Sequence, residues 1–368
     1  MIVQRQLEQN NIVKSSCKDK KFVTLPIISK NQNQQITFVD LFAGIGGFHL
    51  SLHNMGATCV YVAEWDDKCR ETYKTNYQSI SPNLFDNNDN HFARDITKIN
   101  PLEIPNHDIL CAGFPCQPFS ISGKQKGFED KRGTLFFNIL EIIRAKKPKV
   151  IFLENVKHLI NHNNKNTIKT ILSNLESIGY QVSYQILNAK DFGTAQNRER
   201  IIIIASLTKR FDFSKLQKSK PIYIKDILDK QGIFDILDPK DYTILPKELW
   251  TTQKSGLIFC GYRNKNIRTR GVRQNTQHLS RVHKQPNRIY SIEGTHPTIP
   301  SQETSGRFWI YDGKIVRRLT INECYKLQGF PESFIKNNQL CAAYHQIGNS
   351  VAIPMIESVY SQIKEQLL

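Results

Sequence analysis

The segment ILCAGFPCQPFS, residues 109–120, joins a short apolar run to residues that interrupt extended chain. The run Ile109–Ala112 predicts a buried strand. Gly113 and the two prolines end that strand, so Cys116 is predicted to lie on a stiff loop at its carboxyl end. Ligands of open α/β sheets bind at this edge, which makes Cys116 a candidate nucleophile. A structural cysteine in a proline-bounded turn is the alternative.

A glycine-rich turn lies between a predicted strand and a predicted helix nearer the N-terminus. The strand covers residues 36–41, the turn FAGIGG covers 42–47, and the apolar residues of 48–55 predict the helix. Glycines in such a turn let the backbone approach a ligand at the helix N-terminus. The same glycines would also fit a tight turn that binds nothing.

An acidic residue, Glu64, ends the next predicted strand, 59–63. It follows Gly44 by 20 residues, the offset at which an acid can accept hydrogen bonds from both hydroxyls of a ribose. Trp65 beside it offers a flat face to a purine ring. A helix-capping acid beside a core tryptophan is the alternative. Farther along, Asp95 could meet an adenine amino group at a strand end or serve only as a turn residue.

A second carboxylate, Glu154, ends a strand predicted at 150–153. This strand is apolar throughout, as is typical of the middle of a parallel sheet, so Glu154 and Cys116 share one sheet edge if the strands are parallel. Partial burial there raises the pKa of a carboxyl and suits it to proton donation, although a helix-capping acid is the alternative. Downstream, Arg198 and Arg200 need an anionic or carbonyl partner if they are buried, whereas a salt-bridged surface would need none.

The alternation of strands and helices is interrupted once, between about residue 208 and residue 316. It returns near the C-terminus, where 353–367 predicts an amphipathic helix. Two irregular stretches are also predicted, a surface loop at 77–91 and a tight turn at 346–351. We predict a mobile N-terminal arm at 1–35 and a catalytic domain in two pieces, 36–207 and 342–368. Between these pieces we predict an inserted loop-rich domain at 208–316 and a hinge segment at 317–341.

The chain is strongly basic, with 50 Lys and Arg against 33 Asp and Glu, a net charge of +17. Such a surplus points to a polyanionic partner, of which nucleic acid is the expected one. An ordinary solvated charged surface is the alternative. The candidate DNA contacts lie in the loop after Cys116 and in the inserted domain: Ser120, Ser122, Lys124, Arg263, Arg268, Arg270, Arg273, Arg281, Lys284 and Arg288. The basic residues at 122–128 could also form a closing lid.

The remaining composition limits the class of protein. The sequence contains no stretch close to the roughly 20 apolar residues that a membrane-spanning helix needs, and its N-terminus lacks the apolar core of a signal peptide. The eight cysteines form no Cys-x-x-Cys pair. We therefore expect reduced thiols, no metal, no membrane partner and a soluble cytoplasmic protein.

Six short motifs, taken in order, resemble those of the cytosine-C5 DNA methyltransferases of bacterial restriction–modification systems. They are DLFAGIGG at 40–47, GFPCQ at 113–117, ENV at 154–156, QNRER at 196–200, RLT through QGFP at 318–331 and GNSV at 348–351. The resemblance implies an α/β fold: a Rossmann-like S-adenosylmethionine-dependent methyltransferase domain with a smaller, loop-rich target-recognition domain. It also implies double-stranded DNA as the partner. The long N-terminal arm and the residues at 78–90 depart from the family pattern.

The resemblance implies transfer of a methyl group from S-adenosylmethionine to C5 of a flipped cytosine, leaving S-adenosylhomocysteine. Cys116 would add to C6, Glu154 would hold the ring, and Arg198 and Arg200 would support Glu154 and the base carbonyl. The cofactor would be lined by residues from six parts of the chain: Phe42, Gly44, Gly46, Glu64, Trp65, Asp95, Ile96, Pro115, Leu135 and Asn349.

Other functions remain open on the sequence alone. The same chemistry could act on structured RNA, such as tRNA, although the large basic insertion favours duplex DNA. A nicotinamide oxidoreductase would use the glycine turn but would leave the Cys116 loop and both arginines unexplained. Amino-group methylation would need no thiol. We expect a monomer, with a cognate restriction endonuclease as a possible partner acting on the same DNA site.

Overall fold

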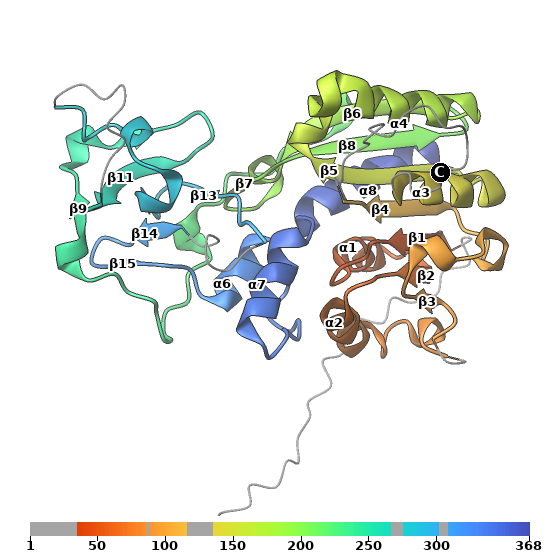
Figure 1. The fold of residues 1–368 in the computed structure, drawn as a ribbon, viewed down its shortest axis with the longest axis horizontal. Helices are drawn as coiled ribbons and strands as arrows, with labels where there is room; N and C mark the ends of the chain where they lie inside the picture. The colour runs from red at the N-terminus through yellow and green to blue at the C-terminus, as the bar shows by residue number, and fades with distance from the viewer. Residues whose placement is uncertain (1–34, 87–88, 116–134, 266–274, 302–307) are drawn as a thin grey trace, which may run out of the picture. The chain divides into compact units, whose positions relative to one another are not determined.

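The predicted strands form a mixed sheet in the computed structural model, which describes residues 35–86, 89–115, 135–265, 275–301 and 308–368. Within these ranges a seven-stranded sheet has the order β3-β2-β1-β4-β5-β8-β6 (Figure 1). Its strands in chain order are β1 Thr37–Leu41, β2 Thr58–Ala63, β3 Phe92–Ala93, β4 Ile109–Gly113, β5 Val150–Val156, β6 Gln181–Asn188 and β8 Glu199–Ser206.

The direction of the strands sets which residues share an edge. The strands β3, β2, β1, β4 and β5 are parallel, whereas β8 is antiparallel to both β5 and β6. The parallel strand predicted at 150–153 is confirmed, and its apolar side chains are buried on both faces. The reversal of β8 could not be predicted, because a run of four isoleucines is apolar whichever way it points.

Helices cover both faces of this sheet. On one face, α1 Gly47–Asn54 and α8 Ile353–Leu367 pack with Phe38 of β1 and Phe152 of β5. On the other face, α3 Leu135–Lys146 and α4 Asn166–Ser177 pack with the alternate strand residues. The helix predicted at 353–367 is confirmed at both ends. None of the helices in the described ranges is both long enough and apolar enough to cross a membrane.

The basic stretch after residue 208 forms a second sheet of short strands. It has the order β10-β11-β12-β14-β15, with β9 paired to β11 (Figure 1). Its small core contains Cys260, Ile289 and Trp309. The strands are β9 Tyr242–Ile244, β10 Thr251–Thr252, β11 Ile258–Arg263, β12 Arg288–Ser291, β14 Trp309–Tyr311 and β15 Val316–Arg317. A separate parallel pair joins β7 Gln196–Asn197 to β13 His296–Pro297.

Two predictions of irregular structure were wrong. Residues 346–351 do not form a tight turn, because α7 Leu340–Asn349 continues through most of them. Gly348 is helical, and its missing side chain admits a neighbouring chain: an added Cβ would lie 2.3 Å from the Pro300 carbonyl oxygen. The segment 77–91 is not all surface, because α2 Asp67–Tyr77 ends in a buried tyrosine and Leu84 is also buried. A further helix, α6, covers Ile321–Leu327.

Candidate active site

The carboxyl ends of β4 and β5 lie side by side. Gly113 pairs with Glu154 in parallel register, three residues before Cys116 in the chain. The predicted common edge for these two strands is therefore confirmed at Gly113. Cys116 itself lies outside the described residues, and Pro115, which is exposed, is the last described residue before it.

The loop that leaves β4 is tied to β5 by a buried amide. Asn155 Nδ2 donates a hydrogen bond of 2.8 Å to the Phe114 carbonyl oxygen, and Asn155 is 3% exposed. A buried amide is costly unless it is paired, so this bond fixes where the chain turns toward Cys116. Sequence reasoning missed this role for Asn155. The feature of the sequence that could have indicated this role is the position of Asn155, a polar residue directly after Glu154 at the end of an apolar strand.

Glu154 is a nearly buried acid with one cationic partner. Its Oε1 lies 3.0 Å from Nε of Arg200, which comes from the neighbouring strand β8. Burial raises the pKa of the Glu154 carboxyl above its ordinary value, and the charges of Arg200 and Arg198 offset part of that effect. The raised pKa favours the protonated form of this carboxyl, which can deliver a proton to a bound group.

Arg198 is buried and donates hydrogen bonds to backbone carbonyl oxygens. Its guanidinium donates to the carbonyl oxygens of Ser350 at 2.7 Å, Gly348 at 3.0 Å and Ile299 at 3.3 Å. The side chain is 1% exposed, and no hydrogen bond joins it to Glu154 within the described residues. Within the described residues Arg198 therefore supports Glu154 through its charge, and its support of the base carbonyl stays a prediction. The last carbonyls of a helix lack helical partners and carry partial negative charge, which explains why α7 attracts this cation.

The glycine turn meets Glu64 at the neighbouring part of the sheet edge. Gly44 N–H donates to Glu64 Oε2 at 2.7 Å, and Asp66 N–H donates to Oε1 at 2.8 Å. Glu64 therefore lies against the glycine turn, and its contact with a ribose stays a prediction. Phe42, Gly44 and Gly46 all have positive φ, from 57° to 81°. Burial raises the pKa of the Glu64 carboxyl, and the two backbone N–H groups oppose that shift.

Asp95, the second residue after β3, caps the short turn that follows it. Asp95 Oδ1 accepts hydrogen bonds from Thr97 N–H at 3.0 Å and from the Thr97 hydroxyl at 2.7 Å. This is the turn-residue alternative, and contact of Asp95 with an adenine stays a prediction. The Thr97 hydrogen bonds lower the pKa of the Asp95 carboxyl. Ile96 is buried in the core beneath α3.

Trp65 is 66% exposed and borders a hollow of about 520 Å³. The hollow lies between the start of α2 and the helix α7. The residues that line it are Trp65, Asp66, Asp67, Lys68, Arg94, Cys341, Ala342, His345 and Gln346. The exposure of Trp65 excludes the alternative of a core tryptophan.

The first and last motifs of the chain are in contact. An added Cβ at Gly47 would lie 2.6 Å from Val351 Cγ2 and 2.9 Å from Ser350 Oγ. Asn349, the last residue of α7, is exposed and its Nδ2 lies 3.2 Å from Nε2 of His345. Leu135 begins α3 and packs partly against the core. The segment after α7 therefore meets the glycine turn, which brings the two ends of the described chain together.

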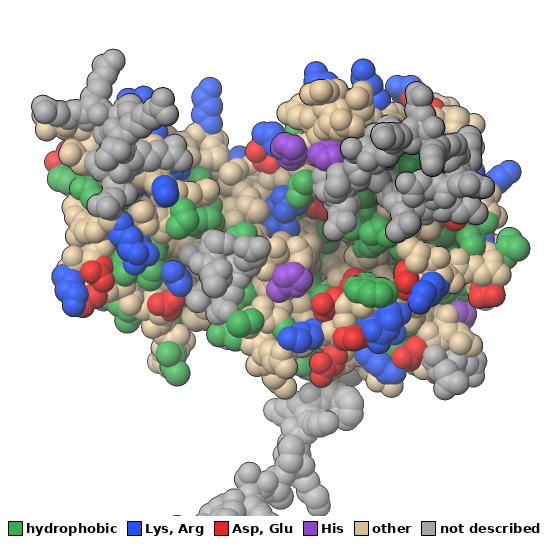
Figure 2. Space-filling view, in the orientation of Figure 1, with side chains coloured by type: hydrophobic (Ala, Val, Ile, Leu, Met, Phe, Trp, Pro, Cys, Tyr) green, Lys and Arg blue, Asp and Glu red, His purple; other side chains and the backbone are tan. Residues whose placement is uncertain are grey.

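The candidate DNA contacts divide into two groups among the described residues. Arg281 and Lys284 are exposed. Arg263 instead lies over the Trp309 ring, 5.4 Å from its centre, and Arg288 donates to the His283 carbonyl oxygen at 3.0 Å. On the face drawn in Figure 2, Lys and Arg side chains occur in several separate places. Six other candidates lie outside the described residues: Ser120, Ser122, Lys124, Arg268, Arg270 and Arg273, as does the predicted lid at 122–128.

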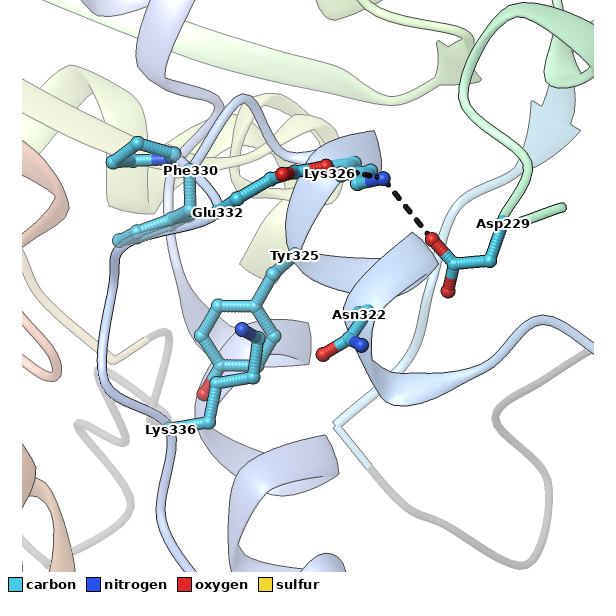
Figure 3. Close-up of a pocket in the computed structure, with 8 residues that line it drawn as sticks. Asp229, Asn322, Tyr325, Lys326, Phe330, Glu332 and Lys336 are labelled. Carbon is cyan, nitrogen blue, oxygen red and sulfur yellow. Dashed lines mark hydrogen bonds and ion pairs between the residues drawn. The ribbon is translucent and has the colours of Figure 1, made fainter. Parts of the chain in front are cut away.

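A further hollow of about 260 Å³ lies between α6 and residues 329–336 (Figure 3). No residue of the predicted site lines it. Lys326 Nζ lies 3.0 Å from Asp229 Oδ1 and 2.7 Å from Glu332 Oε1, so its charge is already compensated. Burial lowers the pKa of Lys336.

Comparisons with known proteins agree with this geometry. The family model described as C-5 cytosine-specific DNA methylase matches residues 36–365. The type II methyltransferase M.HhaI of Haemophilus parahaemolyticus is 37% identical over 92% of this chain and 98% of its own length. The type II methyltransferase M.HpaII of Haemophilus parainfluenzae is 37% identical over 93% of each chain.

Solved structures share the fold at lower sequence identity. The Entamoeba histolytica methyltransferase EhMeth has a TM-score of 0.63 and 20% identity, over 91% of this chain and all of that one. The S. pombe Dnmt2 methyltransferase has a TM-score of 0.62 and 19% identity, over 90% of this chain and 99% of that one. With a family model that spans nearly the whole described chain, and relatives above one-third identity along their full length, the chain belongs to the C-5 cytosine-specific DNA methylases.

Proposed function

We propose that this enzyme transfers a methyl group from S-adenosylmethionine to C5 of a cytosine flipped out of duplex DNA. The observation that carries the proposal is the place of Glu154. It is a buried acid with a raised pKa, paired with Arg200, in register with Gly113 three residues before Cys116. That arrangement suits a thiol and an acid acting on one ring.

The chemistry assigns a separate task to each of these groups. C5 of cytosine is a poor nucleophile within an aromatic ring. Addition of the Cys116 thiolate to C6, with a proton or strong hydrogen bond from Glu154 at N3, moves electron density to C5. C5 would then take the methyl group as the sulfonium S–CH3 bond breaks, so that S-adenosylhomocysteine leaves with the electron pair of that bond. Loss of the C5 proton and expulsion of the thiolate restore the ring and the free cysteine.

Two costs must be met before this reaction can occur. A free thiol has a pKa near 8.5, so only a few per cent is ionised at pH 7 and a positive neighbour must favour the thiolate. The base must also leave the helical stack, which costs a few kcal/mol. DNA contacts from the basic second sheet would offset the cost of flipping.

The residues around the glycine turn fit the cofactor. Within the described chain, no heavy atom lies within 4 Å of the position that a Cβ at Gly44 would take, so the backbone there is open to a ligand. Each oxygen of Glu64 accepts one backbone N–H, which leaves acceptor capacity for ribose hydroxyls. The exposed face of Trp65 suits a purine. When bound, S-adenosylmethionine supplies an electrophilic methyl group on a sulfonium.

The second sheet and its connections are the proposed target-recognition domain, residues 208–316, with 317–341 as a hinge. The relatives named type II methyltransferases support duplex DNA over RNA as substrate. By the same likeness, we propose that the enzyme acts as a monomer in the cytoplasm. It would protect a specific DNA sequence from a cognate endonuclease.

Methyl transfer can be tested with labelled donor on duplex DNA and on tRNA in parallel. The expected product is 5-methylcytosine in DNA alone, identified by mass spectrometry of the hydrolysed nucleosides. Cys116→Ser should abolish it. Labelled tRNA without labelled DNA, or a methyl group on an exocyclic nitrogen, would contradict the proposal. Bisulfite sequencing of DNA from expressing cells would then give the target sequence.

A further inference from the structure

Tyr77 lies directly beneath the glycine turn and has none of the roles assigned above. It is the last residue of α2 and is 1% exposed. Its hydroxyl donates a hydrogen bond of 2.6 Å to the Gly46 carbonyl oxygen. Its ring occupies the space beside Gly46, where an added Cβ would lie 2.4 Å from Cε2 of the tyrosine.

The Gly46 carbonyl is the point where the turn becomes a helix. It accepts the Leu50 N–H at 2.9 Å, the first hydrogen bond of α1, and the Tyr77 hydroxyl fills its second acceptor position. Gly46 has φ of 81°, a backbone conformation that other residues rarely adopt. The hydroxyl of Tyr77 therefore fixes the direction of the peptide that joins the turn to α1.

The turn is thus held from two sides by the second strand–helix unit. Glu64, which follows β2, holds the Gly44 N–H at 2.7 Å, and Tyr77, which ends α2, holds the Gly46 carbonyl. Between these two anchors lies the backbone that is open to a ligand. A turn with a fixed backbone binds a ligand more tightly than a mobile one, because less conformational entropy is lost on binding.

Tyr77 is itself held rigidly. Its ring stacks on the buried His49 ring, with centres 4.1 Å apart. His49 is fixed in turn by the Tyr73 hydroxyl at Nδ1 and by Ser81 Oγ at 3.1 Å from Nε2. Burial holds the pKa of Tyr77 well above its ordinary value, so its hydroxyl keeps the proton that it donates.

We propose that Tyr77 is a positioning residue for cofactor binding. Its hydroxyl holds the Gly46 carbonyl so that the glycine turn is preformed for S-adenosylmethionine. The inference rests on the proposed function, since it concerns the same cofactor site. It differs from the cofactor contacts proposed above because Tyr77 lies in the core behind the turn.

Tyr77→Phe tests this inference, because it removes the hydroxyl and keeps the ring. Loss of one buried hydrogen bond should raise the Kd for S-adenosylmethionine about two- to tenfold in calorimetric titration of the full-length protein. KM for the cofactor should rise to a similar extent, while kcat at saturating cofactor stays within about twofold.

Tyr180→Phe is the matched control. It removes a buried hydroxyl that donates to the Pro148 carbonyl oxygen at 2.7 Å, just before the amino end of β5 and away from the glycine turn. It should lower the midpoint of thermal unfolding without changing the Kd for the cofactor. Equal Kd values for wild type and Tyr77→Phe would overturn the inference, as would an equal weakening in both variants. If the wild type binds no S-adenosylmethionine, the proposed function fails as well.

Discussion

Glu154 is the residue whose protonation matters most to the proposed chemistry. Its carboxyl is buried, its pKa is raised, and among the described residues it forms an ion pair with Arg200. A fully ionised acid could only accept a hydrogen bond from the ring, whereas a protonated one can stabilise charge at N3. The environment of this side chain therefore favours the form that the reaction needs.

Glu154→Gln tests that assignment, because the amide keeps the size of the side chain but cannot transfer a proton. We expect methyl transfer to fall by about 10²- to 10⁴-fold, the usual contribution of a general acid. Glu199→Gln is the control, since Glu199 pairs with Lys157 at 3.0 Å in a more exposed position on the neighbouring strand β8. Single-turnover rates should fall for the first variant alone. Retention of the wild-type rate by Glu154→Gln would contradict the role.

Asp40 is a second buried acid, and it makes stability depend on pH. It is 0% exposed, and neither carboxyl oxygen has a hydrogen-bond partner within the described residues. Burial raises its pKa well above the ordinary value, with the nearby Glu64 adding to the shift and the backbone of His49 opposing it. The folded state therefore binds the Asp40 proton more tightly than the unfolded state does.

The sign of the pH effect follows from that difference. The contribution of Asp40 is fully present below the unfolded pKa, about 3.9, and is lost as pH rises from there toward the folded pKa. Asp40→Asn removes this dependence while keeping the shape. Urea unfolding at pH 4.5 and 7.5 should show a smaller loss of stability with rising pH in the variant than in wild type. Equal losses in the two proteins would show that the Asp40 pKa is not raised.

The end of α7 is the element that joins the base-binding and cofactor-binding parts of the proposed site. Arg198 and Gln328 both donate to carbonyl oxygens there, and Gln196 Nε2 lies 3.3 Å from Gln328 Oε1. Ser350, which follows the helix, contacts the position of Gly47 in the cofactor turn. Arg198 is therefore a positioning residue, and Arg200, two residues on, holds Glu154.

Substitution by lysine should distinguish the role of Arg198 from that of Arg200. Lysine has a single donor nitrogen and cannot reproduce the fork that reaches three carbonyls, so Arg198→Lys should lower the free energy of unfolding by about 1.5–3 kcal/mol in urea titration. Arg200→Lys should reduce methyl transfer by a larger factor than it reduces stability. If Arg198→Lys keeps wild-type stability but loses activity, the positioning role is wrong.

Sequence patterns predicted the elements whose signal is local. The strand–turn–helix unit at 36–55 and the amphipathic helix α8 carry their own periodicity. The partners of Arg198 could not be predicted, because its carbonyl acceptors lie 101 to 152 residues away in sequence. Gly348 suggested a turn, yet its absent side chain serves close packing inside a helix.

At the scale of the whole molecule, one sheet carries the candidate chemistry and a second, smaller sheet carries part of the basic surplus. The net charge of +17 and the exposed Arg281 and Lys284 suit a polyanion. Arg263 and Arg318 lie over the ring of Trp309, so these cations contribute to the core of the second sheet. Charge alone therefore did not distinguish DNA contacts from structural cations.

The central claim is a transient bond between Cys116 and a flipped cytosine. The most direct measurement is mass spectrometry of the complex formed with duplex DNA that carries 5-fluorocytosine at the target, in the presence of S-adenosylmethionine. Fluorine at C5 blocks the final elimination, so the account predicts a stable adduct on the peptide containing Cys116, and none with Cys116→Ser. An adduct on another residue, or equal adduct from wild type and Cys116→Ser, would contradict it.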